Sequence, residues 1–297
     1  MPTLPRLGGL ARDVVGCVRG HDVALYAAGV TFYAGVAAVP LLLISIYLAG
    51  AVVGQDTVRE LARDLTALLP RNLGAEVTAS RLADAGSRLT AVEALLAALP
   101  ASLYGEGLVR AFDRLSVAGE RGRRSLRGRL GSLALVALSP VLLLAGLAAT
   151  SGLTFVLGDG TGARLLGVYL AFLVGWLVIS VVLAVAYRGL APERPAARAL
   201  AWGALGTGSM LSGTSLGYVL FLGIELPLGR AYGGSQVLAG VAVTGLWLYL
   251  LHVMVLLGYV VTLRVAARGG RPLGPVLHED RVRAAPSSAA APDRRAA

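Results

Sequence analysis

The chain of 297 residues has few charged side chains, and it contains no lysine. Asp, Glu and Arg together supply 15% of the residues, whereas a soluble domain carries roughly 25%. Its only cysteine is Cys17, which excludes a disulfide bond within the chain. The composition therefore argues against a soluble globular domain.

Residue patterns for catalysis are equally scarce. The histidines lie far apart, at His21, His252 and His278, and no cluster of carboxylates accompanies them. Metal-dependent hydrolases need such groups together to position ions and water. The sequence also has no Gly-rich phosphate loop and no serine nucleophile elbow. We therefore expect no enzyme activity, no cofactor and no bound metal ion.

Long apolar runs fill most of the chain. Six of them exceed the roughly 20 residues that a helix needs to cross hydrocarbon. A spanning backbone must satisfy its own hydrogen bonds, and the alternation of a membrane barrel is absent. We therefore predict an all-α membrane protein, a bundle of six transmembrane helices. The predicted spans are Val23–Val53, Thr90–Phe112, Leu130–Leu157, Leu165–Tyr187, Ala199–Ile224 and Val237–Leu263.

Arginine is concentrated in alternate connections between these spans. Basic residues in short loops stay on the cytoplasmic side, so both termini are expected in the cytoplasm. The absence of lysine beside abundant Ala, Gly and Leu fits a GC-rich bacterial genome, and the inner membrane is the expected location. Tyr187 and Trp202 flank an inner loop and fit the aromatic belt of a membrane interface. The predicted parts are a cytoplasmic segment 1–22, a transmembrane domain 23–263 and a disordered basic cytoplasmic tail 264–297.

The first external connection, residues 55–89, balances its arginines with an equal number of carboxylates. Apolar residues recur in it at helical spacing, and Pro70 interrupts the pattern. We predict two short amphipathic helices here, lying on the outer membrane face or capping the bundle.

Several short motifs carry a family resemblance. They are Ala27-Ala28-Gly29-Val30-Thr31-Phe32-Tyr33, Pro40-Leu41-Leu42, Tyr187-Arg188, Pro192, Arg194, Trp202-Gly203-Ala204, Tyr232-Gly233-Gly234-Ser235, Trp247-Leu248-Tyr249 and Leu257-Gly258. In combination, from Val14 to Arg268, they resemble the YihY/BrkB family of bacterial inner-membrane proteins. Members of that family often carry Ala-Glu where this chain has Tyr259 and Val260, so no role of that carboxylate transfers.

The resemblance implies six spans with both ends in the cytoplasm, in agreement with the arginine distribution. Family members are often labelled ribonuclease BN, a name that no residue pattern in this chain supports. Links of some relatives to envelope lipids make transport or accommodation of a lipid or another amphiphile the leading hypothesis for this chain. The alternative is a structural or assembly factor of the cell envelope that transports nothing.

The second predicted span contains Glu93 at its outer end and, deeper in the span, Glu106 with Arg110 four residues later. Charged groups inside a membrane cost about 2.5–3.5 kcal/mol on insertion scales and usually face the bundle or water. One interpretation is a polar path or a headgroup contact. The other is an intrahelical ion pair near the inner interface.

Further polar and small residues lie in other spans. His252 is either a proton relay or a hydrogen-bonding residue within the bundle, and Thr31 and Tyr33 are expected to donate interhelical hydrogen bonds. Ser209, Gly213 and Gly217 recur at every fourth position, a spacing that lets membrane helices approach closely. We predict that they pack helices together, with a thin polar wall around a cavity as the alternative.

The densest run of charge lies between the second and third spans, at Arg121, Arg123, Arg124, Arg127 and Arg129. Topology alone explains this run, and it also suits anionic lipid headgroups, at about 1 kcal/mol per residue near the surface. The chain has a formal net charge of +10, but the run lacks interleaved aromatic residues that stack on bases. We expect membrane lipids as partners and no nucleic acid.

Overall fold

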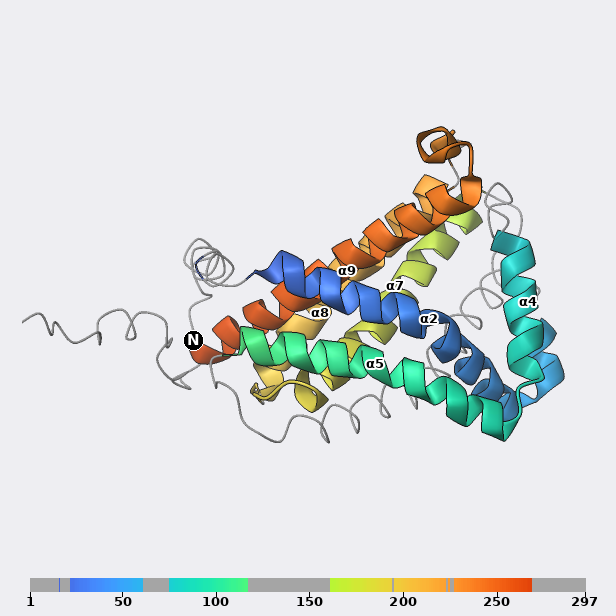
Figure 1. Ribbon diagram of the computed structural model, residues 1–297. Coiled ribbons are helices and arrows are strands. Elements are labelled where there is room, and N and C mark those ends of the chain that lie inside the picture. Colours follow the sequence, from blue (N-terminus) through green and yellow to red (C-terminus); the bar gives the residue numbers. More distant parts are fainter. Residues whose placement is uncertain are drawn as a thin grey trace, which may run out of the picture.

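The computed structural model is helical in the residues that it describes: 22–60, 75–116, 161–193, 195–222 and 227–268, with Gly16 and Ile224. Short helices accompany the long ones (Figure 1). The long helices are α2 (Val23–Val53), α5 (Ala91–Leu115), α7 (Thr161–Gly189), α8 (Ala197–Leu222) and α9 (Gln236–Arg268), and the short ones are α4 (Ala75–Ser87) and the 3-10 helix η2 (Leu228–Tyr232).

Four segments of the described helices are long and apolar enough to cross a membrane. They are Val23–Val53, Ala91–Leu115, Phe172–Gly189 and Gln236–Ala267, and they coincide with the first, second, fourth and sixth predicted spans. The fifth predicted span forms α8, which has 26 residues and is rich in Gly, Ser and Thr. The third, Leu130–Leu157, lies outside the described residues, as do residues 269–297 of the predicted tail. The all-α architecture is confirmed, and the count of six spans stays a prediction.

Polar residues and glycines fix several helix ends. The Asp22 carboxylate accepts the Leu25 N–H at 3.1 Å and caps α2, which continues through Pro40. Gly54, at φ 94°, follows the last residue of α2 in a conformation that suits glycine. At the start of α5, Thr90 and Glu93 form a capping box. These local signals explain why the predicted bounds of the first two spans lie close to the observed ones.

The long helices pack in two groups. In the first group α2 lies against α5 and α4, and in the second α8 packs against both α7 and α9. Glycines opposite hydroxyl residues allow the close approach within the second group. A Cβ atom added to Gly203 or Gly258 would collide with Thr262 or Thr207 across the α8–α9 contact, and one added to Gly208 would collide with Ser180 on α7.

The two groups meet at one end of the molecule and diverge towards the other (Figure 1). We call the end where α2 begins and where α5, α7 and α9 terminate the packed end. Its core joins α2 and α5 to the second group. Members include Val30, Phe112, Tyr187, Leu211 and Leu256. We call the opposite end, where α2 terminates and α5 and α9 begin, the splayed end.

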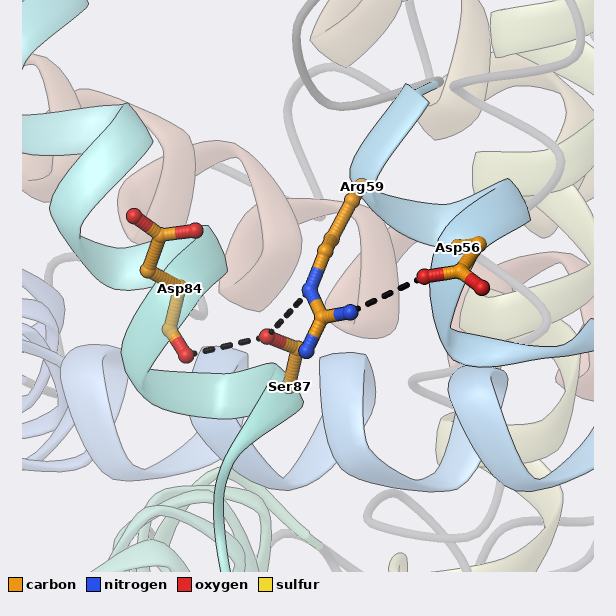
Figure 2. Close-up of polar contacts among 4 residues, drawn as sticks. All are labelled: Asp56, Arg59, Asp84 and Ser87. Atoms are coloured by element: carbon orange, nitrogen blue, oxygen red, sulfur yellow. Dashed lines mark hydrogen bonds and ion pairs between the residues drawn. The ribbon is translucent and has the colours of Figure 1, made fainter.

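The connection between α2 and α5, residues 55–89, carries a short helical stretch at 55–60 followed later by α4, and residues 61–74 lie outside the described ranges. Arg59 joins the two parts, as Figure 2 shows: its Nε donates to Ser87 Oγ at 3.0 Å, and its Nη1 pairs with Asp56 at 3.0 Å. Val58 packs with Ile46 of α2. Both described parts of the connection are helical and pack on α2, and most of the first predicted helix lies outside the described ranges.

Candidate functional site

A buried polar set links three helices midway along the molecule. His252 of α9 is 4% exposed. Its Nε2 lies 3.2 Å from the Tyr104 hydroxyl of α5, and its Nδ1 lies 3.2 Å from Thr31 Oγ1 of α2. We call Thr31, Tyr104 and His252 the polar link, because it ties the first helix group to the second.

The acceptors around the polar link fix its protonation. His252 Nδ1 lies 2.7 Å from the carbonyl oxygen of Leu248, which can only accept, so Nδ1 carries the proton. Nε2 is then an acceptor, and the Tyr104 hydroxyl donates to it. Thr31 Oγ1 donates to the Ala27 carbonyl at 2.8 Å, and Nδ1 shares its one proton between the Leu248 carbonyl and, more weakly, Thr31 Oγ1. Each member therefore has a partner in a neutral network.

The polar link lies close to the apolar core along each of its three helices. On α9, His252 precedes the core residue Leu256 by one turn, and on α5, Tyr104 precedes Leu108 by one turn. On α2, Thr31 directly follows Val30. The polar link therefore lies directly beside the apolar core on each of the three helices.

The other predicted site residues lie elsewhere. Glu106 and Arg110 form an ion pair along α5, with their side chains 39% and 65% exposed. This geometry matches the intrahelical pair of the two interpretations. Tyr33 packs against α5, where a Cβ atom on Gly107 would lie 2.6 Å from its ring. Of the candidate residues, the structure brings together Thr31 and His252.

The small residues of α8 lie on its exposed side. Ser209, Gly213 and Gly217 are exposed, and a Cβ atom on either glycine would meet nothing within 4 Å among the described residues. Close packing within the described helices uses Gly203 and Gly208 instead. Packing at the predicted stripe stays a prediction, because the third span and the arginine loop that starts at Arg121 lie outside the described residues.

An aromatic trio at the packed end is missing from the sequence interpretation. Phe112, Tyr187 and Tyr259 come from α5, α7 and α9, with ring centroids 4.7–5.8 Å apart. All three are fully buried, and the Tyr187 hydroxyl donates to the Val255 carbonyl at 2.7 Å. The prediction that Tyr187 lies in an interface belt is therefore wrong, whereas Trp202 is 65% exposed. The three residues lie far apart in the sequence, so no local sequence signal brings them together.

Within the described ranges, no group of three or more His, Cys, Asp or Glu side chains is arranged to hold a metal ion. Near the packed end, Ser116 donates to Glu193 at 2.8 Å and connects the end of α5 to the α7–α8 loop.

The motifs that carry the family resemblance lie at these helix contacts. Thr31 belongs to the polar link, Gly258 faces Thr207, and Trp247 stacks on Tyr218 with ring centroids 4.5 Å apart. No curated protein and no solved structure matches the chain significantly. The model of the family described as Virulence factor BrkB matches residues 14–277. The chain therefore belongs to the Virulence factor BrkB family of membrane proteins.

Proposed function

We propose that this protein spans the bacterial inner membrane six times, with both termini in the cytoplasm, and that it moves or accommodates a lipid or another amphiphile between its two helix groups. The four apolar helices and the family support a membrane location. The arginine distribution supports the orientation, which would bring the packed end to the cytoplasmic side.

The observation that best supports an amphiphile as cargo is the difference in packing between the two ends. The packed end joins both groups in one core, whereas towards the splayed end the groups diverge (Figure 1). Exposed apolar side chains line the diverging helices, among them Leu96 of α5 and Val241 of α9. The polar link joins α2 and α5 of the first group to α9 of the second. An amphiphile needs apolar surface for its chains, and the exposed apolar side chains of these helices offer it.

A transfer assay tests the proposal. The full chain is reconstituted into vesicles that carry a trace of fluorescent phospholipid in both leaflets, and a membrane-impermeant reductant is added outside. We expect the protein to expose inner-leaflet probe, so that the fluorescence falls further than in protein-free vesicles. His252→Leu should slow this loss, while Leu246→Ala, on an exposed position of the same helix, serves as the matched control.

The competing function is a structural or assembly role in the envelope. Fluorescence loss equal to that of protein-free vesicles, together with stable co-purification of another envelope protein, would favour that role. Reporter fusions at the two termini test the topology separately, and reporters on opposite membrane faces would contradict six spans.

A further inference from the structure

The antiparallel helices α7 and α8 present exposed residues on the same side. They pack closely at Ser180, which lies opposite Gly208, and at Ser212, which donates to the Phe172 carbonyl at 3.3 Å. On each helix, exposed positions follow such contact positions by one residue, which is a turn of about 100°. In an antiparallel pair, the same turn brings both sets to one side of the pair. We call this side the hairpin face.

The hairpin face is apolar or small along most of its length and basic at the packed end. Successive members lie three or four residues apart and therefore share one side of their helix. The exposed members on α7 are Leu177, Val181, Val185 and Arg188, and those on α8 are Arg198, Trp202, Gly206, Ser209 and Gly213.

The two arginines of the hairpin face lie at nearly the same level. The contacts between α7 and α8 set the register of the two helices. Extended to the packed end, this register places Arg188 opposite the segment 196–200, which contains Arg198. The two positions therefore differ by no more than about 3 Å along the helix axes, at 1.5 Å per residue. Both side chains can approach one bound group.

The positive charge of these arginines is not balanced within the described residues. Neither Arg188 nor Arg198 forms an ion pair there, whereas Arg110 of α5 is paired with Glu106. The segment between the two arginines has one carboxylate, Glu193, which is hydrogen-bonded to the end of α5. The described part of the hairpin face is therefore complementary to a group of negative charge.

We propose that the hairpin face binds an anionic phospholipid, with the phosphate at Arg188 and Arg198 and an acyl chain along the apolar residues of α7. Guanidinium groups form paired hydrogen bonds with phosphate oxygens. The glycines of α8 leave room beside the chain, since a Cβ atom on Gly206 or Gly213 would meet nothing within 4 Å among the described residues. Trp202, 65% exposed, suits the membrane interface beside the headgroup.

Quenching of Trp202 by brominated lipids tests the site in the full chain. The protein is reconstituted in phosphatidylcholine vesicles with increasing fractions of brominated phosphatidylglycerol or brominated phosphatidylcholine. The signal of Trp202 is the difference in fluorescence between the unchanged chain and Trp202→Phe. We expect half-maximal quenching by phosphatidylglycerol at about one-fifth of the fraction needed with phosphatidylcholine, the preference that one basic residue near a membrane surface supports.

Charge variants and a second reporter assign this preference. Arg188→Gln combined with Arg198→Gln should make the two lipids quench Trp202 equally, whereas lysine at both positions should retain most of the preference. The matched reporter is Leu25→Trp in the Trp202→Phe chain. Leu25 is 64% exposed, lies at the packed end and follows Asp22 by three residues, so we expect no preference there.

Three results would overturn the site. They are equal quenching of Trp202 by the two lipids in the unchanged chain, a preference that survives both glutamine substitutions, and an equal preference at Leu25. Fluorescence of Trp202 that neither lipid quenches would show that protein covers the hairpin face, and it would overturn the site as well. Quenching measures binding and the reductant assay measures transfer, so either proposal can fail without the other.

Discussion

The two ends of this protein differ in how their helices pack. At the packed end, side chains from five helices share one core, and the aromatic trio fills its centre. Towards the splayed end, α2 keeps its contacts with α5 and α4, while the exposed side of α9 carries Val237, Leu238 and Val241. The difference indicates that stability is concentrated at the packed end, which leaves the other end free to interact with the membrane.

The largest predicted effect comes from the aromatic trio. Phe112→Ala should lower the free energy of unfolding by about 3–5 kcal/mol, because it leaves a cavity where three helices meet. The measurement is thermal unfolding of the purified protein in detergent, followed by tryptophan fluorescence. Leu246→Ala, at an exposed position of α9, is the control. If both substitutions lowered the free energy of unfolding equally, stability would not be concentrated in the core of the packed end.

Glycine substitutions compare a tight helix contact with an exposed helix face, because an added side chain overpacks only the contact. Gly258→Val should cost about 1–3 kcal/mol, because its Cβ would collide with Thr207 of α8 and force the helices apart. Gly213→Val, on the exposed side of α8, should leave the unfolding midpoint close to that of the unchanged protein. A large loss from Gly213→Val would instead support the prediction that Ser209, Gly213 and Gly217 form a packing face.

The polar link should contribute less. His252→Leu leaves the Tyr104 hydroxyl without its acceptor, and interhelical hydrogen bonds in membrane proteins average about 0.6 kcal/mol, with values up to about 1.7. We expect a loss in that range, measured by the same unfolding assay. A double-mutant cycle with Tyr104→Phe isolates the pair, and strictly additive effects would mean that the bond contributes nothing.

The smallest effect should come from the connection between α2 and α5. Arg59→Gln removes the donor to Ser87 and the ion pair with Asp56, and an exposed pair of this kind contributes about 0.2–1 kcal/mol. We expect faster amide hydrogen exchange in α4 and an almost unchanged global unfolding midpoint. A midpoint that falls as far as in Phe112→Ala would show that this region belongs to the main core.

The sequence predicts those parts of the fold that depend on local chemistry. The bounds of α2 match the prediction because Asp22 and Gly54 flank an apolar run, and α5 begins where Thr90 and Glu93 predict a cap. The partners of His252 follow instead from contacts between distant segments, since Tyr104 lies 148 residues away. Tyr187 shows the same limit: beside an arginine loop it resembles an interface residue, and only tertiary packing buries it.

The most direct test of the account compares distances across the two ends in a bilayer. After Cys17→Ser, spin labels are attached at Arg114 and Arg188 to span the packed end, or at Val53 and Val237 to span the splayed end. Pulsed electron paramagnetic resonance in lipid vesicles should give a short, narrow distance distribution for the first pair of labels and longer distances for the second pair. Equally short distances at both ends would mean that the two helix groups run together along their whole length, and the account would be wrong.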